Sequence, residues 1–309
     1  MAPPDLTGLE LGAQPEGYRS GFVSLMGRPN VGKSTLLNQL LRKKVSITSD
    51  RPQTTRNAIR GILTTSEAQL VFVDTPGLHK PVTVLGERLN RVVRATLGEV
   101  DVVVFLVDAA EGIGGGDAFI ADVLRKVSTP VLVAVNKIDQ IDGAKITEQK
   151  GRAASLGGWP VYPVSARTGE GVRPLVSEIS RHLPEGPMFY PSDMQTDQPE
   201  RVLVAELVRE KVLELTREEV PHSVAVVVDD MEADERGLVT IDATIYVERS
   251  SQKGIVIGKG GCMLREAGTK ARREIEALLG SRVLLRLRVK VERDWQRRQS
   301  LVERFGYGA

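Results

Sequence analysis

The feature that most constrains the fold is the octapeptide GRPNVGKS, which begins at Gly27 and lies between an apolar run and an amphipathic stretch. It satisfies the phosphate-loop pattern G-x-x-x-x-G-K-[ST]. The glycines let backbone N–H groups wrap a phosphate, the lysine places its charge on the β- and γ-phosphates, and the serine hydroxyl can bind Mg²⁺. The following helix adds its positive end. The residues predicted to bind phosphate here are Gly27, Arg28, Pro29, Asn30, Val31, Gly32, Lys33, Ser34 and Thr35.

The first two-thirds of the chain alternate short β-branched runs with amphipathic stretches. We expect strands at 21–26, 57–63, 68–74, 100–108, 131–136 and 161–165. We expect helices at 33–41, 85–97, 116–126, 146–155 and 172–182. This alternation predicts an α/β fold with a mostly parallel sheet. The short connection 64–67 fits a hairpin, so one antiparallel strand should lie at the sheet edge.

The length of 309 residues suits two domains, because single cores seldom grow beyond about 250 residues. Segment 183–200 is rich in proline and turn formers and predicts a linker. We expect a disordered tail at 1–18, a first domain at 19–184, a linker at 185–200 and a second domain at 201–309. The second should be a smaller α+β domain: helix 202–216, strands 223–229 and 238–247, a glycine-rich turn, helix 262–279 and strand 283–291.

A second motif, N-K-x-D, follows the apolar strand at 131–135. The Asp139 carboxylate can accept from both the ring N1–H and the exocyclic amine of guanine, a pair that adenine does not offer. Discrimination should be strong, since the wrong base leaves a buried acceptor unpaired. This motif favours a guanine-nucleotide protein over the alternative, a phosphate-loop kinase or ATPase. The predicted base site comprises Asn136, Lys137, Ile138 and Asp139, with Ser165, Ala166 and Arg167 after the next strand.

Two further segments should respond to the γ-phosphate. Asp74 and Gly77 match D-x-x-G, in which the carboxylate holds Mg²⁺ and the Gly77 N–H senses the γ-phosphate. Upstream, segment 48–56 offers a threonine to complete the Mg²⁺ shell, Thr55 being preferred to Thr54. The predicted Mg²⁺ ligands are Ser34, Thr55 and Asp74, and the predicted catalytic residues are Lys33, Thr55, Asp74, Gly77 and Asn30. Thr75, Pro76 and Leu78 complete the predicted GTP site.

These motifs resemble, in order, those of the bacterial translation-factor-related GTPases: GRPNVGKST, QTTR, DTPGLHKP, NKID and SAR. The chain is most similar to the Era family, which joins such a domain to a type-II KH domain, and the resemblance covers about residues 21–296. Leu78 stands where Ras-like enzymes carry a glutamine that orients water, so slow basal hydrolysis is expected. Asn30 resembles an asparagine that helps hold K⁺ in related GTPases; its alternative role is only to stabilise the loop.

The C-terminal end carries the basic charge. Net charge is +2, but residues 249–309 hold 15 Lys/Arg against 6 Asp/Glu. Such an end indicates nucleic acid, an anionic membrane or a solvated charged face. Residues 255–261 match the (I/V)-I-G-x-x-G loop of KH domains, which clamps about four nucleotides. The predicted RNA-binding residues are Lys253, Ile257, Gly258, Lys259, Gly260, Gly261, Arg265, Lys270 and Arg273, with Arg272 beside them.

By resemblance, the partners would be GTP or GDP and single-stranded rRNA near the 3′ end of the 16S rRNA, and the role would be small (30S) subunit assembly. We expect a cytoplasmic protein, because the one cysteine fits a reducing compartment and the start carries no secretion signal. We also expect a monomer. Peripheral docking on the inner face of the membrane, or on protein, is the alternative use of the basic end. Cys262 is expected in the core, and Trp295 either stacks on a base or packs the last strand.

Overall fold

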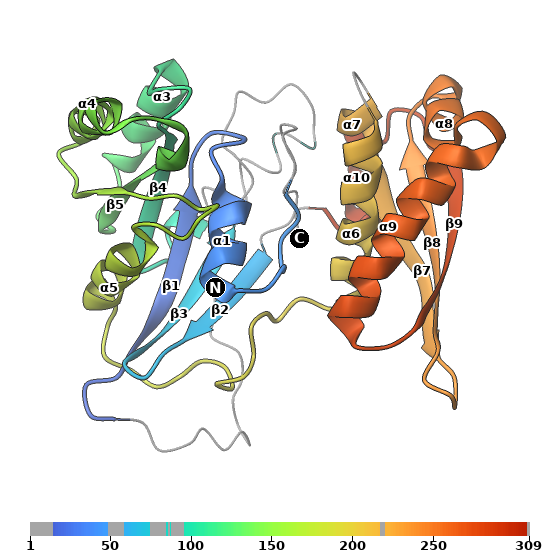
Figure 1. Ribbon diagram of the computed structural model, residues 1–309, viewed down its shortest axis with the longest axis horizontal. Coiled ribbons are helices and arrows are strands. Elements are labelled where there is room, and N and C mark those ends of the chain that lie inside the picture. Colours follow the sequence, from blue (N-terminus) through green and yellow to red (C-terminus); the bar gives the residue numbers. More distant parts are fainter. Residues whose placement is uncertain are drawn as a thin grey trace. The chain divides into compact units, whose positions relative to one another are not determined.

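The structure is a computed structural model that describes residues 15–48, 59–74, 85, 87, 96–216 and 220–307, without the side chains of 221 and 222. Apart from a few earlier residues, the chain divides after Asp197 into two compact units. Figure 1 labels the elements of both units. Each unit has its own sheet and its own core, so each is described by itself.

The first unit is built on a six-stranded sheet with the order β2-β3-β1-β4-β5-β6. Its strands are β1 (Arg19–Met26), β2 (Ile59–Thr64), β3 (Ala68–Asp74), β4 (Val102–Asp108), β5 (Val131–Asn136) and β6 (Val161–Pro163). All pairings are parallel except that of β2 with β3. Every residue of β3 and β4 is buried, as expected of strands covered on both faces. The predicted fold class, including the antiparallel edge strand, is confirmed.

Helices supply the apolar side chains that cover this sheet. Leucines of α1 (Lys33–Leu41) and Ile179 of α5 (Val172–His182) join one core cluster. Ile120 of α3 (Gly115–Leu124) and Ala153 of α4 (Gly143–Ala154) join another. Both cores receive side chains from alternate positions of the central strands, which places one core on each face of the sheet.

Most predicted boundaries are within a few residues of those in the structure, and 33–41, 68–74, 131–136 and 172–182 match it. Helix α4 begins three residues before the predicted start, because the Asp142 carboxylate caps it by accepting from the Lys145 N–H at 2.8 Å. Strand β4 begins at Val102 and β6 ends at Pro163, so both are shorter than predicted. Of the predicted helix 85–97, the described residues Leu85, Glu87, Thr96 and Leu97 are helical, and the others lie outside the description.

The proline-rich segment predicted as a linker packs on the first unit before the chain continues into the second. Phe189 stacks on Phe22 with ring centroids 5.3 Å apart. The side-chain oxygen of Gln69 accepts from the backbone N–H groups of Phe189 and Tyr190, at 2.7 and 3.0 Å. Arg60 forms a 2.7 Å ion pair with Asp197. The segment up to Asp197 is thus held along the β2–β3 side of the sheet.

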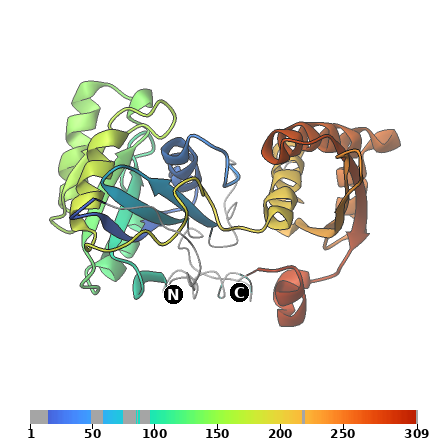
Figure 2. The ribbon, with the colours of Figure 1, turned by 90° about the horizontal axis from the view of Figure 1, so that it is seen from below.

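The second unit pairs helices with a three-stranded sheet of order β7-β8-β9. Strand β8 pairs antiparallel with β7 and parallel with β9. Figure 2 shows α6 and α9 against the same side of this sheet. Their apolar residues, among them Val208 and Ala271, form one core with the strands. The elements are α6 (Glu200–Leu215), α7 (Val220–Ser223), β7 (Ala225–Ala233), β8 (Val239–Val247), α8 (Ser250–Ile257), α9 (Cys262–Leu279), β9 (Val283–Val291) and α10 (Gln299–Arg304).

The structure corrects two expectations for this unit. Residues 250–257, expected to lie in the turn region between strand 238–247 and helix 262–279, form helix α8. Its first turn is capped by the Gln252 side chain, which accepts from the backbone N–H groups of Glu248 and Arg249, and Val256 is fully buried. Cys262, expected in the core, is exposed because it is the first residue of α9, at the mouth of the glycine loop.

Trp295 packs inside the unit, which is one of the two roles expected for it. It is fully buried, and its indole N–H donates to the Ser223 carbonyl at 2.8 Å. Its ring meets those of Phe305 and Tyr307, and Phe305 also stacks on Tyr246. This aromatic cluster fastens the segment after β9 to the sheet.

Candidate functional site

The phosphate loop connects β1 to α1, and one buried amide ties it to the two loops expected at the base. The Asn136 side-chain amide donates to the Val31 carbonyl at 2.8 Å, and its oxygen accepts from the Ala166 N–H at 2.9 Å. Gly32 has a φ of +99°, and a Cβ there would collide with the Asn136 amide nitrogen. Glycine is therefore required at this position both by backbone conformation and by close approach. The three predicted loops meet at one edge of the sheet.

Lys33 is 6% exposed and turns back onto its own loop. Its ammonium donates to the carbonyls of Gly27 and Arg28 at 3.2 and 3.0 Å. Burial lowers the pKa of Lys33 to about 8, and the nearby Asp74 carboxylate partly opposes that shift. Because burial disfavours its charge, an arriving phosphate would stabilise the ammonium strongly. The lysine therefore lies within the loop that is predicted to bind the phosphates.

The Asp74 carboxylate gathers two hydroxyl groups at the end of β3. Ser34 donates to it at 2.7 Å and Ser46 at 2.9 Å. Ser46 is held in turn by Asn38 of α1, whose oxygen accepts from the N–H groups of Val45 and Ser46 and whose amide donates to the Ser46 carbonyl. Such hard oxygen donors fit Mg²⁺, which prefers carboxylates, hydroxyls and water. Sequence reasoning found Ser34 and Asp74 but missed Ser46 and Asn38.

At the base site, the Asp139 carboxylate accepts from the Ser165 hydroxyl at 2.6 Å and forms an ion pair with Arg167. The Ser165 hydrogen bond lowers the pKa of Asp139; burial opposes that shift and the Arg167 charge supports it. The acid is therefore held ionised, as a guanine acceptor must be. Ile138 is buried, and Lys137 has a φ of +68°, which starts the turn that presents Asp139.

Asp108 is a site residue that sequence reasoning missed. It ends β4, is 1% exposed, and its carboxylate lies 2.5 Å from the Lys137 ammonium. Its other oxygen accepts from the N–H groups of Ala110 and Glu111 at 2.8 and 3.0 Å. The available signal was an aspartate at the carboxyl end of an apolar strand, where the ligands of open α/β sheets bind.

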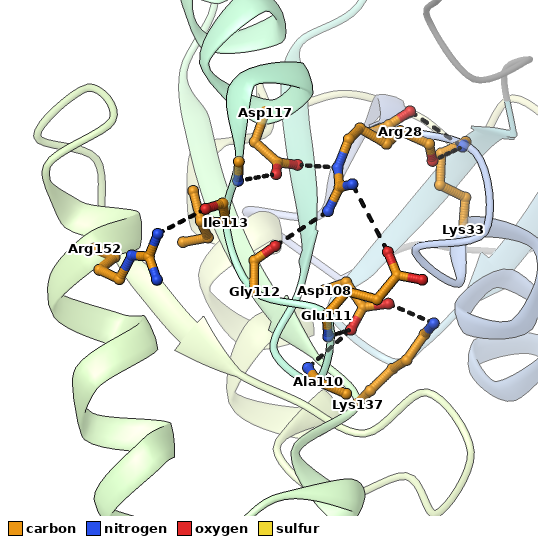
Figure 3. Close-up of polar contacts among 12 residues, drawn as sticks. Arg28, Lys33, Asp108, Ala110, Glu111, Gly112, Ile113, Asp117, Lys137 and Arg152 are labelled. Carbon is orange, nitrogen blue, oxygen red and sulfur yellow. Dashed lines mark hydrogen bonds and ion pairs between the residues drawn. The ribbon is translucent and has the colours of Figure 1, made fainter.

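The other predicted GTP-site residues divide into two groups. Arg28 is half-buried and directed toward Asp117 of α3 (Figure 3), Asn30 is exposed with a φ of +65°, and Pro29 and Thr35 are half-buried. Thr54, Thr55, Thr75, Pro76, Gly77 and Leu78 lie outside the described residues. The arrangement described is therefore that of the phosphate loop, the Mg²⁺ carboxylate and the base loops.

The predicted RNA loop lies between α8 and α9, and its glycines at 258, 260 and 261 have φ values of +73°, +60° and +77°. A Cβ on Gly258 would approach the Met263 backbone nitrogen to 2.9 Å, whereas nothing lies within 4 Å of one on Gly260 or Gly261. The loop also leads directly into the N-terminus of α9, whose backbone N–H groups attract anions. An open turn of this kind lets a sugar-phosphate chain approach the backbone closely.

The basic residues predicted to bind RNA differ in how directly they contact this loop. Arg265 donates to the Gly260 carbonyl at 3.4 Å, whereas Lys270 pairs with Glu266 at 2.9 Å. On α9, Arg265 and Lys270 are about 140° apart, at 100° per residue. Lys259, Arg272 and Arg273 are exposed, and Lys253 and Ile257 are half-buried. The structure thus brings Lys259 and Arg265 to the loop more directly than Lys270.

Among the residues that the structure describes, no group of His, Cys, Asp and Glu side chains could hold a metal by itself. No helix in that part of the chain is both long and apolar enough to cross a membrane.

Known proteins match both halves of the chain. Residues 22–137 match the model of the 50S ribosome-binding GTPase family, and residues 219–296 match that of the KH domain. GTPase Era of Heliobacterium modesticaldum is 50% identical over 293 residues, which are 94% of this chain and 98% of that protein. The chain belongs to the Era family of GTPases. The predicted family and enzyme class are confirmed.

Solved structures of Era are similar over the same extent. One, in complex with MgGDPNP and nucleotides 1506–1542 of 16S ribosomal RNA, is 42% identical with a TM-score of 0.91. An Aquifex aeolicus Era variant bound to GDP·AlF₄⁻ is 41% identical, also with a TM-score of 0.91. Both comparisons cover 94% of this chain and all of the other.

Proposed function

We propose that this GTPase is a molecular switch whose second domain binds single-stranded rRNA near the 3′ end of the 16S rRNA, and that it thereby assists assembly of the 30S subunit. The observation that carries the RNA half is the GKGG loop, whose glycines open directly onto the N-terminus of α9. Its likeness to Era solved with that part of the 16S rRNA supports the assignment. We place the protein in the cytoplasm, as a monomer; its one exposed cysteine agrees with a reducing compartment.

In this function the phosphate loop and Lys33 bind the β- and γ-phosphates, while Asp139, oriented by Ser165, selects guanine. Mg²⁺ would be held by Ser34 and Asp74, and it neutralises charge on the transferred phosphoryl group. We assign the remaining protein ligand to Thr55 and the γ-phosphate contact to the Gly77 N–H. Those segments would order around the γ-phosphate and relax after hydrolysis.

Hydrolysis should be slow without a partner, because Leu78 cannot orient the attacking water. We propose that Asn30, exposed on the phosphate loop, helps to hold K⁺ beside the phosphates and that the ion supplies charge that no arginine finger provides. Turnover should then be faster in potassium than in sodium buffer. Equal turnover in the two buffers contradicts this role and leaves Asn30 as a loop-stabilising residue.

The test of the RNA half replaces Gly258 and Gly261 with Asp. Each change places a negative charge and a Cβ at a positive-φ position that faces the proposed sugar-phosphate chain. Filter binding to an oligonucleotide with the 16S 3′-terminal sequence should lose its signal, while mant-GTP binding stays at the wild-type level. RNA binding that survives both changes would show that the glycine loop is not the contact.

Docking on an anionic membrane is the alternative role of the basic C-terminal end. The salt dependence of binding distinguishes this role from RNA binding. Exposed arginines of β9, such as Arg288, pair with Asp242, which weakens the second domain as a plain cationic surface. We expect rRNA fragments to be retained at salt concentrations that release the protein from phosphatidylserine vesicles. Release from both at the same salt would favour non-specific charge attraction.

A further inference from the structure

Asp117 is a buried charge that the nucleotide site as described does not use. It lies in the first turn of α3 and is 0% exposed. One carboxylate oxygen accepts from the Gly114 N–H at 2.9 Å, and the other accepts from Arg28 Nε at 2.9 Å (Figure 3). A buried carboxylate is tolerated only when it is paired and hydrogen-bonded. The partner of Asp117 is Arg28, a residue of the phosphate loop. Asp117 therefore restrains the phosphate loop.

The Arg28 side chain is fitted to this position at several points. Its guanidinium also donates to the Gly112 carbonyl at 3.2 Å and lies 3.7 Å from the Glu111 carboxylate. The aliphatic part of the Arg28 side chain packs against Gly116, where a Cβ would come within 2.6 Å of it. The planar fork of arginine suits such multiple contacts, and lysine could not reproduce them.

The main chain of Arg28 faces the other way. Its carbonyl accepts from the Lys33 ammonium at 3.0 Å. Figure 3 shows the guanidinium directed at Asp117 and the carbonyl directed at Lys33, at opposite ends of the residue. Holding the side chain therefore places the carbonyl that keeps the lysine within the loop. Arg28 and Asp117 are 89 positions apart, so the contact joins the phosphate loop to a distant segment.

The segment that contains Asp117, residues 108–117, also contacts the base site. Its first residue, Asp108, accepts from the backbone N–H groups of Ala110 and Glu111 and contacts the Lys137 ammonium. Residues 108–117 thus contact the phosphate loop through Arg28 and the N-K-x-D loop through Lys137. Contacts of this kind restrict the conformations open to the phosphate loop, and preorganised sites bind more tightly because less order has to be created on binding.

We infer that Arg28 is a positioning residue: its ion pair with Asp117 holds the phosphate loop in its binding conformation and so sets affinity for the β-phosphate that GDP and GTP share. It does not act as an arginine finger, because its guanidinium is committed to Asp117. The inference rests on the GTP-binding half of the function proposed above.

The test compares Arg28→Met, Arg28→Lys, Asp117→Asn and the double variant R28M/D117N. Losing a charge-assisted hydrogen bond should weaken mant-GDP and mant-GTP binding by roughly tenfold to a hundredfold, raising KM while kcat changes far less. Arg28→Lys should fall between wild type and Arg28→Met. The double variant should be no weaker than the worse single variant, because both changes break one interaction.

Arg152→Met is the matched control, since Arg152 of α4 donates to the Ile113 carbonyl of the same segment at 2.8 Å without touching the phosphate loop. It should keep wild-type affinity, and thermal melting of each variant checks folding. Three results would overturn the inference: GDP affinity unchanged while kcat collapses, additive losses in the double variant, or an Arg152→Met loss equal to that of Arg28→Met. Wild-type protein that binds no guanine nucleotide would instead refute the proposed function.

Discussion

The phosphate loop and the predicted RNA loop both precede helix N-termini, and they differ in what surrounds them. Residues 27–32 lead into α1 and are held by two other segments, since Asn136 donates to the Val31 carbonyl and Asp117 accepts from Arg28. Lys33 also folds back onto the Gly27 carbonyl of the same loop. Residues 258–261 lead into α9 with open space over Gly260 and Gly261. Lys33 is buried, whereas Lys259 is exposed. The same local chemistry is enclosed in one case and left open in the other.

The difference matches the size of the ligand expected at each. A nucleotide is one small molecule, so a site held rigid by buried contacts can select its shape and charge. A polynucleotide enters and leaves along its length, so its loop must remain open at both ends. Changes at the enclosed loop should therefore cost more affinity than comparable changes at the open one. Two glycine substitutions test that ordering, and two serine substitutions test the contacts around the nucleotide site.

The largest effect is expected for Gly32→Ala, which forces a Cβ against the Asn136 amide at a φ of +99°. Backbone strain and displacement of the amide should lower mant-GTP affinity at least about a hundredfold. Gly143→Ala is the control, because nothing lies within 4 Å of its Cβ at the start of α4. Equal affinities for the two variants would contradict the enclosed character of the loop.

A smaller effect is expected at the open loop for Gly258→Ala. Its φ of 73° and ψ of 169° belong to a region that only glycine occupies readily. RNA affinity should fall about thirtyfold, the equivalent of about 2 kcal/mol of strain. Gly260 has φ 60° and ψ 22°, which asparagine tolerates, so Gly260→Asn should bind RNA nearly as well as wild type. Equal losses at both positions would mean that side-chain bulk, not conformation, decides binding.

Ser46→Ala tests the contacts around Asp74. Removing the hydroxyl that donates to Asp74 at 2.9 Å leaves the Mg²⁺ carboxylate less well oriented. The Mg²⁺ concentration that gives half-maximal GTP hydrolysis should rise about tenfold. Ser20→Ala is a matched buried serine at the far end of β1, bonded to the Pro187 carbonyl, and should leave that concentration unchanged. An equal shift in both variants would point to general loosening of the sheet.

The smallest effect is expected for Ser165→Ala, which removes the hydrogen bond that holds the pKa of Asp139 low. At neutral pH, mant-GDP affinity should fall about fivefold. A lowered pKa keeps the carboxylate ionised until pH falls through that lowered value. In the variant the pKa rises, so affinity should begin to fall at a higher pH than in wild type. Ser155→Ala, whose hydroxyl bonds only its own helix, should follow the wild-type titration.

Much of this comparison was predictable from sequence, because phosphate and base loops are contiguous motifs that follow apolar strands. The bounds of strands β3 and β5 and of helices α1 and α5 match the prediction, because local sequence patterns also mark these elements. Helix α8 was missed because Gly254 lowers helix propensity and Ile255–Ile257 has the apolar, β-branched character of a strand. Burial of Val256 and the Gln252 cap outweigh that local preference.

The supporting residues of the site could not be read from the chain. Asp117 lies in the first turn of a helix and would be taken for an ordinary N-terminal acid. Its role depends on Arg28, which no periodicity relates to it. Ser46 donates to the Asp74 carboxylate at the end of β3, and Asn38 holds Ser46 through its backbone. Contacts between distant segments are set by the packing of the whole sheet, which a single sequence does not specify.

Cys262 gives the open loop a practical use. It is the only cysteine among 309 residues, it is exposed, and it directly follows Gly261. A thiol-specific reagent would therefore modify the wild-type chain at one known point, without prior removal of other cysteines. The rate of alkylation there would provide a footprint of whatever occupies the loop, measurable on unlabelled RNA and in each nucleotide state.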